Sequence, residues 1–126
     1  MADIEELQGT WSVETLQVNG GDMPSGMFKG AKIEIEDSRF TTTGMGETYS
    51  GAIQIDASQQ PKTLDMIFTS GVHKGLSSLG IYELNGQTWT LCLGFAGKDR
   101  PKGFATKAGS NSALETLKRE SERSKQ

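Results

Sequence analysis

Few side chains in this sequence have the types and spacing that enzymatic chemistry requires. His73 is the single histidine among the 126 residues, so a metal site with several histidine ligands is excluded. Its place among glycines and a lysine in an expected loop predicts an exposed side chain. Cys92 is the single cysteine, and its alternation with Leu91 and Leu93 is typical of a small hydrophobic strand residue. These residues predict no catalytic nucleophile, no metal site and no disulfide within the chain.

The carboxylates and the known motifs lead to the same conclusion. Asp65 and Glu83 could converge as an acid–base pair, but both fall on expected strands, where carboxylates usually face water. No CxxC, HExxH, GxSxG or phosphate-loop pattern occurs, and Gly44-Met45-Gly46 lacks the third glycine of a dinucleotide site. The sequence contains no catalytic constellation, and we expect a protein that is not an enzyme and binds no cofactor.

Length and composition predict a single domain of residues 1–120. A hydrophobic fraction of 34% and 16 glycines indicate many turns around a modest core. No apolar run approaches the length of a membrane span, and the acidic N-terminus does not resemble a signal peptide. We expect a soluble protein without a membrane span, which is cytoplasmic if Met1 is the native start. Residues 121–126 are polar and are expected to form a disordered tail.

The charges are divided unevenly along the chain, whose net charge is −3. Residues 1–56 contain three Lys and Arg against ten Asp and Glu, whereas the remainder contains ten against six. The basic residues have no aromatic residues interleaved with them, so the pattern does not predict nucleic-acid binding. It favours charge pairing between the two ends of the chain.

The segment from Leu79 to Phe95 predicts the β-hairpin around which the chain is organised. Two runs of β-branched, aromatic and aliphatic residues flank Asn85-Gly86, the dipeptide preferred in type I′ turns. With this dipeptide as the loop, Tyr82 is expected opposite Trp89. One face of the hairpin then collects the large core residues Tyr82, Leu84, Trp89, Leu91 and Leu93.

Residues 32–37 have the cleanest strand alternation in the chain. Ile33 and Ile35 share one side, and charged residues share the other. If Asp37-Ser38 forms the turn, Ile35 lies opposite Phe40, so apolar side chains face each other across the hairpin. This register is self-consistent and predicts a second antiparallel pair.

The remaining segments predict an all-β fold of about eight strands. Residues 9–18 begin as a strand but change phase near Thr15, which predicts a β-bulge. The segment 112–120 is ambiguous, because 112–115 matches a helix capping box whereas a barrel needs a closing strand; we favour the strand. Further strands are expected at 47–56, 62–69 and 104–106, and a helical turn at 2–7. The predicted architecture is an antiparallel up-and-down β-barrel.

Six short motifs resemble, in order, the uncharacterised lipocalin-like domain family that is common in planctomycetes. They are LxGTW at 7–11, PKxLD at 61–65, GIYELxG at 80–86, LC at 91–92, RPxxF at 100–104 and LKR at 117–119. The resemblance covers nearly the whole chain and implies a lipocalin-like, or calycin-type, barrel. It also implies that Arg119, late in the last strand, packs across Trp11 of the opening motif. The family has no established activity.

Two functions remain open at this stage. The first is non-enzymatic binding of a small hydrophobic or amphipathic molecule in the barrel mouth, since such interiors hold either side chains or one small ligand. The long segment 20–30 would cover this mouth, or its apolar residues would plug the core. The second is a protein-interaction or inhibitor-type module with a filled interior. The candidate ligand-binding residues are Met23, Met27, Phe28, Phe40, Met66, Phe68, Tyr82 and Trp89. Ligand, protein partner and oligomeric state are not determined by the sequence.

Overall fold

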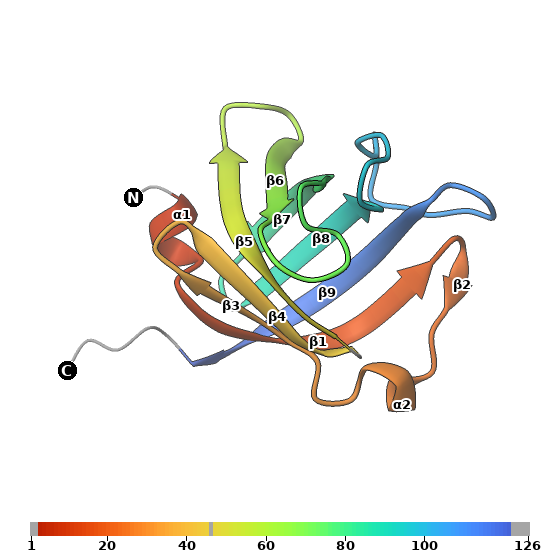
Figure 1. Cartoon of the computed structure of the whole chain (residues 1–126), viewed down its shortest axis with the longest axis horizontal. Helices are drawn as coiled ribbons and strands as arrows, with labels where there is room; N and C mark the ends of the chain where they lie inside the picture. Colours follow the sequence, from red (N-terminus) through yellow and green to blue (C-terminus); the bar gives the residue numbers. More distant parts are fainter. Residues whose placement is uncertain (1–2, 46, 122–126) are drawn as a thin grey trace.

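Alternating apolar residues along the chain form strands that close into an antiparallel β-barrel (Figure 1). The computed structural model describes residues 3–45 and 47–121. The strands are β1 (Gly9–Val18), β2 (Gly21–Asp22), β3 (Lys32–Glu36), β4 (Arg39–Met45), β5 (Glu47–Asp56), β6 (Lys62–Phe68), β7 (Ser77–Asn85), β8 (Thr88–Gly94) and β9 (Ser112–Ser121). Two short helices are α1 (Asp3–Glu6) and α2 (Ser25–Phe28).

The barrel contains eight strands, and β2 is an additional short strand beside β1. Neighbouring strands follow the order β1-β3-β4-β5-β6-β7-β8-β9, and β9 pairs with β1 to close the sheet. All of these pairs are antiparallel. The prediction of an all-β antiparallel up-and-down barrel with a short N-terminal helical turn is confirmed.

The two ends of the barrel carry different connections. We call one end the α1 end; it holds α1 and the short connections β3–β4, β5–β6 and β7–β8. We call the other the loop end; its longer connections are residues 19–31, 69–76 and 95–111. In Figure 1, α1 lies at the left, whereas α2 and β2 lie at the right. The long segment 20–30, which contains β2 and α2, thus lies at the loop end.

The core fills the inner face of the barrel with large apolar side chains. Trp11 and Trp89 are both fully buried, and their rings contact each other edge to face with centroids 5.4 Å apart. Other buried residues of this cluster are Leu7, Val13, Phe28, Ile33, Ile35, Phe40, Ile53, Leu64, Met66, Tyr82, Leu91 and Leu117. Burial of these side chains is the dominant stabilising contribution.

Arg119 closes the α1 end. Its guanidinium carbon lies 4.3 Å from the centre of the Trp11 ring, and its Nη1 donates to the carbonyl of Gln8 at 2.8 Å. Nη2 donates to the carbonyl of Glu6, and the indole of Trp11 donates to the carbonyl of Leu7 at 2.9 Å. The last carbonyls of a helix have no partner within the helix, so these donors satisfy groups that α1 leaves open. The resemblance also led us to expect a largely buried Arg119, but the residue is half-buried.

A second set of contacts attaches α1 to the opposite wall. One carboxylate oxygen of Asp3 accepts hydrogen bonds from the Tyr82 hydroxyl at 2.7 Å and from the Lys62 ammonium at 2.9 Å. The bond from Lys62 is the main reason that the pKa of Asp3 is lowered, and burial works against it. Together with the Arg119 contacts, these bonds hold α1 across the α1 end of the barrel.

The predicted register of the β3–β4 hairpin is confirmed, because Ile35 pairs with Phe40. The bulge near Thr15 is also confirmed, because Val13 pairs with Leu117 but Thr15 pairs with Thr116. The bulge places Leu16 on the same face of the sheet as Val13, as the break in the alternation near Thr15 indicated. The ambiguous segment 112–120 is a strand, so the helical alternative is excluded.

Two sequence-based predictions about the C-terminal half are wrong. In the β7–β8 hairpin Leu84, not Tyr82, pairs with Trp89, because the two-residue loop is Gly86-Gln87. Of the expected turn dipeptide, only Gly86 takes a positive φ, 60°, while Asn85 ends β7. The shift is two residues, so every side chain stays on its predicted face. Residues 104–106 form no strand and belong to the irregular connection 95–111.

Two further findings concern the limits of the domain. No helix among residues 3–45 and 47–121 is long and apolar enough to cross a membrane. The expected tail at 121–126 falls outside the described residues except for Ser121, whose backbone ends β9.

We predict that Arg119→Lys lowers the free energy of unfolding by about 1–2 kcal/mol, because lysine loses the planar stack on Trp11 and one of the two carbonyl contacts. Urea unfolding monitored by tryptophan fluorescence measures the change. Arg39→Lys is the matched control, since Arg39 is exposed, and it should change stability by less than about 0.5 kcal/mol. Equal effects of the two substitutions would contradict a closing role for Arg119.

Candidate functional site

The structure divides the eight predicted ligand-binding residues between the core and the loop end. Phe40, Met66, Tyr82 and Trp89 are buried on the inner face, with at most 3% of each side chain exposed. Phe28 is also buried and anchors α2 to the core. Met23 and Phe68 are half-buried against this core, and Met27 is exposed. The eight residues therefore do not form one site, and those that solvent can reach lie at the loop end.

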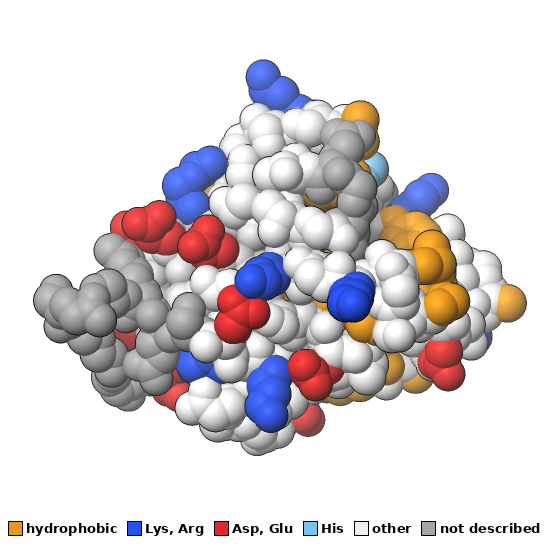
Figure 2. Space-filling view, turned by 90° about the horizontal axis from the view of Figure 1, so that it is seen from below, with side chains coloured by type: hydrophobic (Ala, Val, Ile, Leu, Met, Phe, Trp, Pro, Cys, Tyr) orange, Lys and Arg blue, Asp and Glu red, His pale blue; other side chains and the backbone are white. Residues whose placement is uncertain are grey.

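The loop end has an apolar rim. Of the large hydrophobic residues in the part of the chain that the structure describes, three are exposed: Met27 by 61%, Val72 by 68% and Leu76 by 45%. All three belong to loop-end connections. Figure 2 shows hydrophobic side chains gathered towards the end that carries α2 and β2. Exposed apolar residues that gather at one end of a barrel are typical of an interaction or entry site.

An aromatic cluster supports the rim on the side of β5 and β6. The Tyr49 ring stacks on the His73 imidazole with centroids 5.2 Å apart, and Phe68 contacts Tyr49 edge to face at 5.7 Å. Phe40 extends the cluster inward through an edge-to-face contact with Phe68 at 5.5 Å. His73 is half-buried, so the prediction of an exposed loop histidine is wrong. Its ring covers apolar surface that the strand aromatics leave open.

Glu115 is a buried acid on the inner face of the barrel. It is the fourth residue of β9 counted from the loop end, and it alternates with Leu117 and Arg119, which both face inward. Its side chain is 6% exposed, and its Oε1 has no hydrogen-bond partner among the described residues. Opposite it lie Leu91 on β8 and Leu16 on β1, so its cross-strand neighbours are apolar. Burial raises the pKa of Glu115 to about 7.

A second polar atom inside the barrel is also unpartnered. The indole nitrogen of Trp89 is buried and makes no hydrogen bond to the described residues. Trp89 pairs with Leu117 and Leu91 pairs with Glu115, so Trp89 and Glu115 are diagonal neighbours on adjacent strands. The Nε of Arg119 is likewise buried without a partner, so among the described residues the interior offers two donors and one acid whose hydrogen-bonding capacity the protein itself does not use.

The inner face also carries small residues among the bulky ones. Ser78 and Ala113 are the second residues of β7 and β9, which both begin at the loop end. Gly51 and Gly80 occupy inward positions further along their strands, as their pairing with Phe68 and Leu93 indicates. Neither glycine leaves open space, because a Cβ at Gly51 would lie 1.9 Å from the carbonyl oxygen of Ile67 and one at Gly80 would lie 2.5 Å from the side chain of Leu93.

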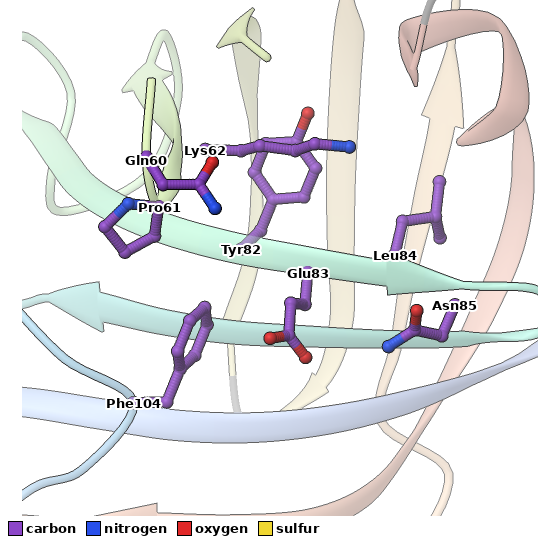
Figure 3. A pocket seen from close by; sticks show the side chains of 8 residues that line it. All are labelled: Gln60, Pro61, Lys62, Tyr82, Glu83, Leu84, Asn85 and Phe104. Atoms are coloured by element: carbon purple, nitrogen blue, oxygen red, sulfur yellow. The ribbon is translucent and has the colours of Figure 1, made fainter. Parts of the chain in front are cut away.

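Several hollows lined by side chains lie outside the barrel interior. One of about 420 Å³ is lined by Gln60, Pro61, Lys62, Tyr82, Glu83, Leu84, Asn85 and Phe104 (Figure 3). It runs along the edge of β7 beyond Lys62, where β6 has no residue to pair. Figure 3 shows Tyr82 and Lys62 on one side of β7, and Glu83 and Phe104 on the other. This hollow is a groove at a strand edge, and the polar ends of Tyr82 and Lys62 are already bound to Asp3.

The connection 95–111 forms a second layer over the outer face of β6, β7 and β8. Arg100 donates to the carbonyls of Gly80 at 2.8 Å and Leu64 at 3.1 Å, and it forms an ion pair with Asp65 at 2.8 Å. Cys92 is fully buried beneath this layer, and burial raises the pKa of its thiol. A buried thiol with a raised pKa is a poor nucleophile.

The carboxylate pair considered from the sequence does not form. Asp65 pairs with Leu79 across β6 and β7, which leaves Glu83 four residues further along β7. Asp65 is bound to Arg100, and Glu83 is exposed. No group of three or more His, Cys, Asp or Glu side chains suited to a metal ion occurs among residues 3–45 and 47–121.

We predict that Glu115 makes stability fall as pH rises. Its ordinary pKa is 4.5 and burial raises it to about 7, so between these pH values the folded state holds a proton that the unfolded state has released. The free energy of unfolding should therefore decrease by up to about 3 kcal/mol from pH 4.5 to pH 7 and stay low above it.

The measurement is urea unfolding at pH 5 and pH 8 for the unaltered protein, Glu115→Gln and Glu34→Gln. Glu34 is exposed on the outer face of β3 and serves as the control. Glu115→Gln should reduce the difference between the two pH values, and Glu34→Gln should leave it unchanged. The same pH difference in all three proteins would contradict a buried, protonated Glu115.

Comparisons of the chain with protein-family models, with curated proteins and with solved structures found no match. The lipocalin-like family therefore stays a prediction from the six motifs, whereas the barrel architecture rests on the strand pairing described above.

Proposed function

We propose that this chain is a non-enzymatic binder of a small amphipathic molecule, which enters the barrel from the loop end. The observation that carries the proposal is the contrast between the two ends. Arg119, Trp11 and Asp3 hold α1 across the α1 end through a cation–π stack and hydrogen bonds. The loop end instead carries the exposed apolar residues Met27 and Val72.

The residues at the loop end are of the kind that small-molecule sites use. Such sites are mostly apolar, with a few polar groups that fix the orientation of the ligand. Met23 and Phe68 supply apolar surface between the rim and the core, and the flexible thioether of a methionine adapts to ligands of different shape. Tyr49 and His73 add a flat aromatic wall.

The segment 20–30 supports this function as an anchored cover. Phe28 is buried in the core and fixes α2, while Met27, one residue earlier, is 61% exposed. The carbonyl of Leu16 accepts a hydrogen bond from the Met23 amide at 2.9 Å, which holds the start of the segment against β1. A cover fixed at these two points keeps its apolar residues at the mouth. Phe28 itself acts as a core plug, which is the other role expected for this segment.

A second candidate function is a protein-interaction module with a filled interior. The observation that favours it is the dense packing of the inner face, where Trp11, Tyr82 and Trp89 are each no more than 1% exposed. In that case the apolar rim would contact a protein partner directly. The two functions differ in whether a small apolar molecule competes for the loop end.

We predict that Nile red, a neutral apolar dye, binds with saturable fluorescence enhancement and that Met27→Ser weakens its affinity by roughly threefold or more. The reason is the loss of apolar contact at the rim. Because Met27 is exposed, the substitution should change the free energy of unfolding by less than about 0.5 kcal/mol. Dye titration and urea unfolding give the two values.

Thr88→Ser, an exposed site at the α1 end, is the control and should leave dye affinity unchanged. Dye binding that is lost equally in both variants would place the site elsewhere. The absence of saturable dye binding to the unaltered protein would favour the protein-interaction module.

A further inference from the structure

We propose that Glu115 is the specificity-determining group of the barrel and that it binds the ammonium group of an amine whose apolar body extends towards the loop end. The inference rests on the proposed function and names the class of ligand. It begins from Glu115, a residue that is 6% exposed and whose Oε1 is buried with no partner among the described residues.

Glu115 has no structural role that the fold itself reveals. A buried carboxyl normally accepts hydrogen bonds or pairs with a cation, because burying it without a partner is costly. The cations nearest along β9 are otherwise engaged or face outward: Arg119 stacks on Trp11, and Lys118 is exposed. Across the strands Glu115 meets Leu91 and Leu16. The nearest unpartnered donor is the indole N–H of its diagonal neighbour Trp89, which carries no charge. A cation that pairs with Glu115 would therefore come from outside the protein.

The position of Glu115 fixes how a ligand would lie. It is four residues into β9 from the loop end, so its carboxyl lies roughly 10 Å along the strand from that end. Ala113 lies between it and the end of the strand on the same face and leaves more room than a large residue would. A ligand that reaches Glu115 with its polar head would leave its apolar part beside Leu93 and the half-buried Met23, which pack on the core.

The chemistry around Glu115 favours an amine over an acid or an alcohol. An ammonium group donates up to three hydrogen bonds and forms an ion pair with the carboxylate, and such charge-assisted bonds are roughly twice as strong as neutral ones. A carboxylate ligand would meet a like charge or compete for the same proton. A neutral alcohol would donate one hydrogen bond without the ion pair. The surroundings are apolar, which strengthens the pairing with a cation.

The test uses three probes that share one phenyl ring and a two-carbon spacer: 2-phenylethylamine, 2-phenylethanol and 3-phenylpropanoate. Isothermal titration calorimetry at pH 7.5 gives the affinities, and tryptophan fluorescence reports independently because Trp89 is the diagonal neighbour of Glu115. We expect the amine to bind about tenfold more tightly than the alcohol, and the carboxylate to bind most weakly.

Glu115→Gln should lower the affinity of the amine about tenfold and leave that of the alcohol within about twofold. Glu34→Gln, the exposed control on β3, should leave all three affinities unchanged. Glu115→Leu provides a second variant that removes the acid without adding an unpaired amide, and it should also abolish the preference for the amine. If a variant fails to fold, the order of the three probe affinities for the unaltered protein still tests whether the site prefers an amine.

Equal binding of the amine and the alcohol, or a preference for the amine that survives both Glu115 substitutions, would overturn this assignment. Nile red separates the two proposals. If the dye binds but the amine is not preferred, the role of Glu115 is wrong and the binding function stands. If neither the dye nor any probe binds, both proposals are wrong.

Discussion

The stack of Arg119 on Trp11 is the interaction on which the rest of this barrel depends. It joins the first and last strands of the sheet and binds the carbonyls of Glu6 and Gln8 at the end of α1. Because an arginine guanidinium is planar and carries several donors, one side chain can cover the indole and hold the helix at the same time. Because α1 is held across this end, the function that we propose places ligand entry at the loop end.

The same strand that provides this closure also determines the polarity of the interior. Residues of β9 alternate between the two faces, so the register that places Arg119 under Trp11 also places Glu115 inside the barrel. A slip of one residue would expose both groups together. The bulge between Val13 and Thr15 keeps Leu16 inward and opposite Glu115. Closure and interior chemistry are therefore linked through one strand register, and a change in either would alter the other.

Local patterns predicted the strands well because strand alternation is a local property. Ile35 and Phe40 pair as expected since the intervening turn, with Asp37 at a φ of 58°, is short and fixes the register. The β7–β8 hairpin was shifted by two residues, because Gly86 alone of its expected turn pair adopts a positive φ. The connection 95–111 could not be predicted, since Arg100 anchors it to carbonyls on β6 and β7 that are remote in sequence.

Glu115 was missed although the sequence contains the signal for it. The resemblance implies that the Arg119 side chain points into the barrel. Strand alternation then places Leu117 and Glu115 on the same inner face. This assignment was not made because the sequence of 112–120 also fits a helix. Its burial weakens the fold at neutral pH, since the pKa raised to about 7 reflects desolvation without a compensating charge. An acidic residue that stabilises the fold is normally paired with a cation of the same protein. Asp65 forms an ion pair with Arg100, and Asp3 forms one with Lys62. Glu115 differs from both because it has no cation partner among the described residues, and in our proposal that charge comes with the ligand.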